Sequence, residues 1–75
     1  MGVIIVRPGF SDEEIAGMVY ALMKMGQLRR CEYYTRILRK VKEIASVSEE
    51  RMPLILEMMV ARKRLVFDGE KYCVV

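Results

Sequence analysis

The fold is decided by one stretch of the chain, residues 37–75, which reads ILRKVKEIASVSEERMPLILEMMVARKRLVFDGEKYCVV. Apolar residues recur there at helical spacing in two segments, and a short serine-containing break separates the segments. The stretch ends in two runs of strand-forming residues that meet at Asp68-Gly69, a pair that favours a tight hairpin turn. It therefore predicts helix, turn, helix and β-hairpin in that order.

The two helices predicted in this stretch have different surfaces. The first, which extends back to residue 28 or 31 and ends near residue 45, has one apolar face and one charged face. The second is apolar around nearly its whole circumference, so it needs burial on every side. Ser48 can cap it, but Pro53 would then remove a hydrogen bond just past the first turn. We expect a tight first turn, a kink or a start nearer Arg51.

The hairpin has a register that follows from its turn. Counting outward from Asp68-Gly69 places Phe67 opposite Glu70 and Leu65 opposite Tyr72. Side chains alternate between the two faces of a strand, so each strand presents every second residue to the helices. The face predicted to pack on the helices comprises Leu65, Phe67, Tyr72 and Val74.

The residues before this stretch supply a strand and another helix. Val3-Ile4-Ile5-Val6 is a β-branched run that suits a strand covered on both faces. Ser11 and Glu14 match a capping box, which predicts a helix over residues 12–25 that Gly26 closes. The 75 residues fit a single domain. The predicted fold is therefore α+β, with a three-helix core, an N-terminal strand and a C-terminal β-hairpin over residues 1–75.

From Ile37 onward the chain resembles the winged helix-turn-helix superfamily. An amphipathic helix ending KEIA, a tight turn, a helix opening SEER and running into LILEMM, and a hairpin turning on DG follow the usual order of that superfamily. The resemblance implies a fold of winged-helix type. It also implies a DNA-binding protein of the transcription-regulator type, with duplex DNA as its partner.

Two departures from that superfamily bear on function. Its members usually read base edges with the second helix of the pair, but here that helix carries three glutamates and offers only Arg51 as a base contact before Arg62. Its members also often place a short strand between the first two helices, whereas the obvious strand here precedes the first helix. We therefore expect DNA to be held by its phosphates more than read by its bases.

The distribution of positive charge supplies the candidate phosphate contacts. Thirteen basic and ten acidic residues leave a formal charge of only +3, so the total charge does not indicate a polyanionic partner. The predicted helix over 28–45 and the hairpin, however, concentrate cations. The alternative is a solvated helix face with ion pairs such as Glu32 with Arg36 and Glu43 with Arg39. The candidate nucleic-acid contacts are Arg29, Arg36, Arg39, Lys40, Lys42, Arg51, Arg62, Lys63, Arg64 and Lys71.

The apolar surplus of the helices predicts a homo-oligomer. Two of the three predicted helices expose more apolar surface than a chain of this length can cover, although a monomer with exposed methionines is the alternative. Methionine side chains are flexible and tolerate imperfect packing, which favours them at a subunit interface. The candidate interface residues are Met18, Met23, Met52, Leu54, Met58 and Met59. A protein–protein or self-assembly module without nucleic-acid binding is therefore the alternative function.

Other classes of function have little support in the sequence. There is no His and no Gly-rich phosphate loop, so we expect no enzyme, no cofactor and no metal site, and no small-molecule ligand is evident. Cys31 and Cys73 are open to three interpretations: small buried hydrophobes, a disulfide, or a metal or catalytic role. No apolar segment reaches membrane-spanning length, and no targeting signal is apparent, so a cytoplasmic protein is expected. The charged content of 31% hints at a thermophilic source.

Overall fold

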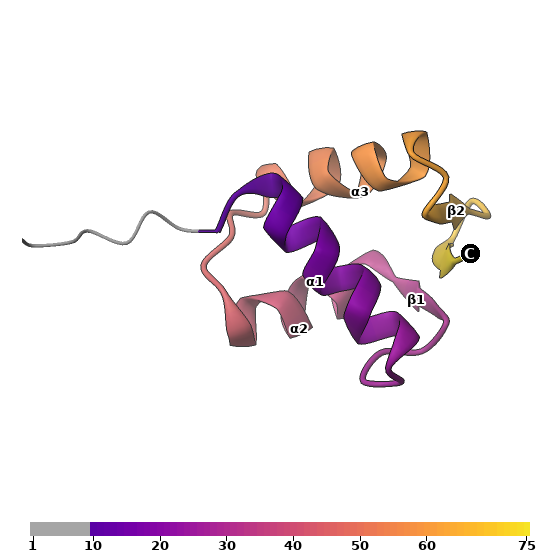
Figure 1. The fold of residues 1–75 in the computed structure, drawn as a ribbon, viewed down its shortest axis with the longest axis horizontal. Helices are drawn as coiled ribbons and strands as arrows, with labels where there is room; N and C mark the ends of the chain where they lie inside the picture. The colour runs from indigo at the N-terminus through magenta and orange to yellow at the C-terminus, as the bar shows by residue number, and fades with distance from the viewer. Residues whose placement is uncertain (1–9) are drawn as a thin grey trace, which may run out of the picture.

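The structure, a computed structural model, describes residues 10–75 and contains three helices and one three-stranded sheet (Figure 1). In chain order the elements are α1 (Asp12–Lys24), β1 (Cys31–Tyr33), α2 (Tyr34–Ile44), α3 (Arg51–Ala61), β2 (Leu65–Phe67) and β3 (Lys71–Val74). The sheet is antiparallel in the order β1-β3-β2. This confirms the α+β class. The predicted N-terminal strand, residues 3–6, lies outside the described residues.

Helix α1 begins and ends where its capping residues predict. The Ser11 hydroxyl accepts the Glu14 backbone N–H at 3.2 Å, and the Glu14 carboxylate accepts the Ser11 N–H at 2.9 Å, which completes the capping box. The helix ends at Lys24, and Gly26 follows with φ of +86°, a conformation that residues with a Cβ rarely adopt. The predicted bounds of 12–25 are therefore correct to within one residue.

The segment before α2 is a strand, so the predicted start of this helix at residue 28 or 31 is wrong. Cys31–Tyr33 pair with β3, and α2 begins only at Tyr34. Three residues are too few for a periodic pattern, and pairing with a segment about 40 residues away overrides the local helical signal. The chain therefore does place a strand between its first two helices, contrary to the expectation from sequence.

Helix α3 begins at Arg51, which is one of the three outcomes expected from Pro53. The Ser48 hydroxyl accepts the Arg51 N–H at 3.1 Å, so Ser48 still caps the turn that leads into the helix. With this start Pro53 lies in the first turn, where backbone N–H groups have no partner within the helix. Its missing N–H therefore costs no helical hydrogen bond.

The hairpin has a different register from the predicted one. Phe67 pairs with Tyr72 and Leu65 with Val74, because Asp68 starts the turn instead of standing at its centre. Its carboxylate accepts the Glu70 N–H at 2.9 Å and the Lys71 N–H at 2.7 Å, and both bonds lower the pKa of Asp68. The pairing shifts by two positions, which keeps the same residues on each face. Leu65 and Val74 are buried as predicted, whereas Phe67 remains 48% exposed.

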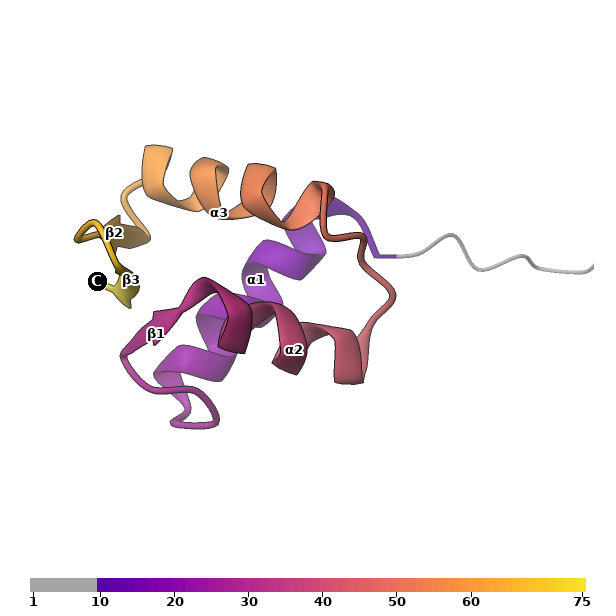
Figure 2. The same ribbon diagram turned by 180° about the vertical axis from the view of Figure 1, so that it is seen from behind.

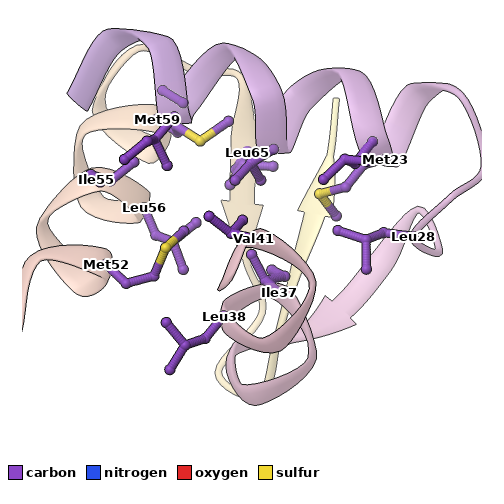
Figure 3. Close-up of a cluster of buried hydrophobic side chains, with 14 of the residues drawn as sticks. Met23, Leu28, Ile37, Leu38, Val41, Met52, Ile55, Leu56, Met59 and Leu65 are labelled. Atoms are coloured by element: carbon purple, nitrogen blue, oxygen red, sulfur yellow. The ribbon is translucent and has the colours of Figure 1, made fainter. Parts of the chain in front are cut away.

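The core lies where the three helices meet the inner face of the sheet. Both ribbon views place α3 and α2 on opposite sides with α1 crossing between them, and the sheet at the end of the molecule beside the C-terminus of α3 (Figure 1, Figure 2). Side chains from all three helices and from Leu65 converge in the space between them (Figure 3). The largest fully buried side chains are Ile15, Val19, Met23, Ile37, Val41, Met52, Ile55, Leu56, Met59 and Leu65.

Candidate nucleic-acid interface

The cations of α2 are mostly neutralised by nearby carboxylates. The Lys40 ammonium lies 3.7 Å from the Glu43 carboxylate, one turn along the same helix. The Lys42 ammonium lies 3.5 Å from the Glu49 carboxylate, which the connection to α3 supplies. Glu43 therefore pairs with Lys40 and not with Arg39, the partner that helical spacing also allowed. The charge that the sequence assigns to this helix is largely cancelled within the chain.

Arg36 has an acidic partner as well, and that partner is buried. The Arg36 guanidinium lies 4.0 Å from the carboxylate of Glu32, the pair that the sequence predicted. Glu32 is only 5% exposed and also accepts the Arg29 backbone N–H at 3.3 Å. Among the cations of α2, only Arg39 lacks an ion pair with a carboxylate of residues 10–75. We define the α2 face as Arg36, Arg39, Lys40 and Lys42.

The two arginines at the ends of α3 form ion pairs with carboxylates of α1. The Arg51 guanidinium donates to the Asp12 carboxylate at 2.6 Å and to the Phe10 carbonyl at 3.0 Å. The Arg62 guanidinium donates to both oxygens of the Glu13 carboxylate at 2.6 Å. The Arg62 hydrogen bond lowers the pKa of Glu13, with a smaller contribution from the charge of Arg64, and raises the pKa of Arg62. Arg51 is therefore not placed to contact a base.

The outward face of α3 carries no cation between these two arginines. A helix that reads the major groove presents donors and acceptors to the bases, and positive charge to the phosphates. Here the outward face is acidic and apolar, and Leu54 is 61% exposed. Its exposed residues are Glu50, Pro53, Leu54, Glu57 and Ala61.

Five other cations gather at one end of the sheet. They come from the end of α1, the loop before β1, and the turn between α3 and β2, and all five are exposed. The sheet brings the last two segments together, because Val74 donates to the Arg30 carbonyl at 2.8 Å and Val75 donates to the Arg64 carbonyl at 3.1 Å. None of the five forms an ion pair with a carboxylate within the described part of the chain. We define the basic corner as Lys24, Arg29, Arg30, Lys63 and Arg64.

Two members of the basic corner share one aromatic ring. The Lys24 ammonium lies 5.4 Å from the centroid of the Tyr20 ring, and the Arg64 guanidinium carbon lies 5.8 Å from the same centroid. Each cation gains from the negative face of the ring, but the two like charges repel each other. The end of α1 and the start of β2 thus concentrate positive charge where an anion would relieve the repulsion.

Lys63, a member of the basic corner, has a left-handed backbone conformation that is unfavourable for a residue with a side chain. Helix α3 ends in a Schellman motif, in which Lys63 N–H donates to the Val60 carbonyl at 3.0 Å and Arg64 N–H donates to the Met59 carbonyl at 2.9 Å. Lys63 occupies the left-handed position of this motif with φ of +61°, where glycine is the usual residue. Strained positions of this kind are concentrated at functional sites.

Lys71 lies apart from the basic corner, on the outer face of the sheet. Its ammonium is 4.9 Å from the centroid of the Tyr33 ring, and the Tyr33 hydroxyl donates to the Glu70 carboxylate at 3.5 Å. Tyr33 is 43% exposed, and an exposed aromatic ring can stack on a base. In the structure, Lys71 covers its ring and Glu70 holds its hydroxyl.

The basic corner therefore contains three of the ten predicted contacts, Arg29, Lys63 and Arg64, and two that sequence reasoning missed, Lys24 and Arg30. Lys24 sits at a helix C-terminus, where a cation is ordinary, so nothing singled it out. Arg30 precedes a strand that was not predicted. The missing signal was the β1–β3 pairing, which brings residues 29–30 to the same end of the sheet as residue 64.

The residues predicted to form an oligomer interface fall into three groups by their exposure. Met23, Met52 and Met59 are at most 1% exposed and pack inside the core of a single chain, so they are not available to a partner. Met18 and Met58 are partly buried against that core, and Leu54 is exposed. Of the six, only Leu54 presents a mainly exposed side chain.

Cys31 and Cys73 form a disulfide between β1 and β3. They are directly opposite each other, and the Val74 to Arg30 hydrogen bond beside them shows that they form a non-hydrogen-bonded pair, the type in which the strands approach most closely. Cys31 is exposed, so the interpretation as two small buried hydrophobes is wrong. The disulfide lies on the outer face of the sheet, one residue from Arg30.

Among residues 10–75 no three His, Cys, Asp or Glu side chains are arranged to hold a metal ion. No helix in that part of the chain combines the length and the apolar character needed to cross a membrane. No protein-family model matches the chain, and no curated protein or solved structure shows significant similarity to it.

Proposed function

We propose that this chain is a domain of winged-helix type that binds nucleic acid through its phosphates. The element order α1-β1-α2-α3-β2-β3, with a strand between the first two helices and a hairpin after the third, supports the resemblance found in residues 37–75. The fold supplies two features that the proposal needs, a sheet end that gathers basic segments and a rigid three-helix core behind it.

The main support for the proposal is that the cations of the basic corner form no ion pairs with carboxylates of residues 10–75. These five cations converge from three segments of the chain. Exposed cations that lack protein partners can release counterions from a polyanion, which drives binding to DNA backbones. Lys63 adds support, because a cation is kept there at a backbone position that suits glycine.

The proposed mode of binding is independent of base sequence. Helix α3 offers Glu50, Leu54 and Glu57 outward, and its terminal arginines are bound to α1. A negative and apolar helix face does not enter the major groove favourably. The duplex is instead held at the end of the sheet, and affinity depends on phosphate spacing and on salt.

The test is a fluorescence-anisotropy titration of a random-sequence duplex at two salt concentrations. Five phosphate contacts predict a slope of log affinity against log salt of about −4 to −5. A second duplex of unrelated sequence should bind within about threefold of the first, since phosphate contacts carry no base information. Absence of binding at low salt, or a slope near zero, would overturn the proposal.

A second candidate function, self-association, is favoured by the outward face of α3 and the adjoining hairpin. Leu54 is 61% exposed, and Phe67 is 48% exposed beside a hollow lined by Glu57, Val60, Ala61, Phe67 and Tyr72. A second copy of the chain offers a matching apolar face. Sedimentation velocity of the wild type and of Leu54→Glu separates the two states: a dimer that the substitution dissociates supports this function, and a wild-type monomer at high concentration excludes it.

A further inference from the structure

We propose that the Cys31–Cys73 disulfide is a redox switch for the basic corner, an inference that rests on the proposed function. The bond joins β1, which follows two cations of the corner, to β3, which lies between β1 and the β2 strand that follows Lys63 and Arg64. Arg29 and Arg30 immediately precede Cys31, and Val75, two residues after Cys73, donates to the Arg64 carbonyl at 3.1 Å. The disulfide therefore ties the segment of Arg29 and Arg30 covalently to β3, whose end is hydrogen-bonded to Arg64.

Without the disulfide, β1 is held by its backbone pairing with β3, by the buried Glu32 and by the contacts of Tyr33 with Lys71 and Glu70. The strand has three residues and, among residues 10–75, pairs with β3 alone at one edge of the sheet. Neither cysteine belongs to the hydrophobic core, whose members come from the helices, Leu28, Val47, Leu65 and Val74. The buried Glu32 is the one β1 side chain directed inward. Short edge strands with few buried apolar contacts open at low free-energy cost.

The disulfide is open to a soluble reductant. Cys31 is exposed and Cys73 is partly exposed on the outer face of the sheet. In thiol–disulfide exchange a dithiol thiolate attacks one sulfur, and the second thiol of the reagent resolves the mixed disulfide. The Sγ–Sγ bond breaks, each cysteine gains one electron and one proton, and the dithiol is oxidised to its own disulfide.

Reduction of the disulfide should weaken DNA binding, because the cations of the basic corner are then no longer all held in fixed positions. Arg29 and Arg30 then lose their fixed place in the short segment between the buried Leu28 and β1, while Lys24, Lys63 and Arg64 stay on α1 and on the turn after α3. Two of five phosphate contacts lose their fixed place, which lowers the slope of log affinity against log salt by about 2. At low salt the affinity falls at least about tenfold, because ordering a mobile segment opposes the remaining contacts.

The experiment compares the oxidised and reduced full chain in the same DNA titration. Thiol titration establishes the redox state, and circular dichroism establishes that the three helices persist. The matched control is the Cys31→Ser/Cys73→Ser double variant, which is expected to bind like the reduced wild type whether or not dithiol is present. A double variant whose affinity still changed with dithiol would contradict the inference.

The remaining outcomes separate the switch from the proposed function. If oxidised and reduced chains bind DNA equally well, the proposed redox switch is wrong, and the proposed binding of DNA by the basic corner is retained. If neither binds, the proposed function is wrong, and the switch fails with it. If reduction melts the helices, the inference of a local release of β1 is overturned.

Discussion

Two surfaces of this chain carry a similar number of cations and differ in what surrounds them. On the α2 face, Lys40 and Lys42 lie 3.7 Å and 3.5 Å from carboxylates, and Arg36 lies 4.0 Å from the buried Glu32. In the basic corner, no cation is paired with a carboxylate of residues 10–75, and two of them lie over the Tyr20 ring. Our proposal therefore rests on the absence of ion pairs in the basic corner more than on the density of Lys and Arg.

The two surfaces also differ in how they are assembled. The α2 face lies on one helix, and local hydrogen bonds hold its spacing. The basic corner is assembled from residues up to 40 positions apart, which the sheet, the disulfide and the packing of α1 against the turn after α3 bring together. Its geometry therefore depends on tertiary structure, and treatments that open the sheet should affect the corner before they affect α2.

Reduction of the disulfide should have the largest effect on stability. The bond closes a loop of 42 residues, for which chain entropy predicts a loss of about 4 kcal/mol in unfolding free energy, and measured losses are typically about 2–4 kcal/mol. Urea unfolding with and without dithiol measures this loss. Hydrogen exchange should show faster exchange at β1 and little change at α2 under native conditions. Equal acceleration in both elements would break the distinction between the two surfaces.

The Lys63→Gly variant should separate stability from binding. Glycine removes the strain of a φ of +61°, so the free energy of unfolding should rise by about 0.5–1 kcal/mol. The same change removes a cation of the basic corner, so DNA affinity should fall and the salt slope should drop by about 1. Lys63→Asn is the matched control, because asparagine tolerates the left-handed region and also lacks the charge. A variant that is more stable and binds DNA unchanged would remove Lys63 from the site.

Removing carboxylates from the α2 face should give the smallest effect. Glu43→Gln and Glu49→Gln together free Lys40 and Lys42, and exposed pairs of this kind contribute about 0–1 kcal/mol to stability. The double variant should bind DNA a few times more tightly, because two cations become available to phosphates. The same anisotropy titration measures this gain. Unchanged affinity would mean that the location of α2 in the fold, and not the ion pairing of its cations, prevents this helix from contacting DNA.

The elements with strong local signals could be predicted from the sequence. The Ser11–Glu14 capping box predicts the start of α1, and Pro53 left a start of α3 near Arg51 as one of three alternatives, which the structure selects. The hairpin was predicted at the correct place but in the wrong register. Asp68 can be a central residue of a two-residue turn, or it can precede a longer turn and accept the backbone N–H groups of that turn. Local sequence does not choose between these.

The candidate site was harder to predict, since it depends on pairing between distant segments. Strand β1 has only three residues and was read as part of a helix, so Arg30 was overlooked and Cys31 was left open to several interpretations. The carboxylates that neutralise α2 were visible in the sequence, but the choice of Glu43 for Lys40 and of Glu49 for Lys42 depends on rotamers and on the path of the α2–α3 connection. The ion pairs of Arg51 and Arg62 with α1 required the tertiary fold.

The most direct test of the central claim compares two triple variants in one DNA titration at low salt. Lys24→Ala/Arg30→Ala/Arg64→Ala alters the basic corner, and Arg39→Ala/Lys40→Ala/Lys42→Ala alters the α2 face. Each loses three of the charges that give the chain +3, so both are formally neutral. The corner variant should lose at least about tenfold in affinity and about 3 in salt slope, while the α2 variant stays within about threefold of the wild type. Equal losses in the two variants, with both still folded by circular dichroism, would contradict the account.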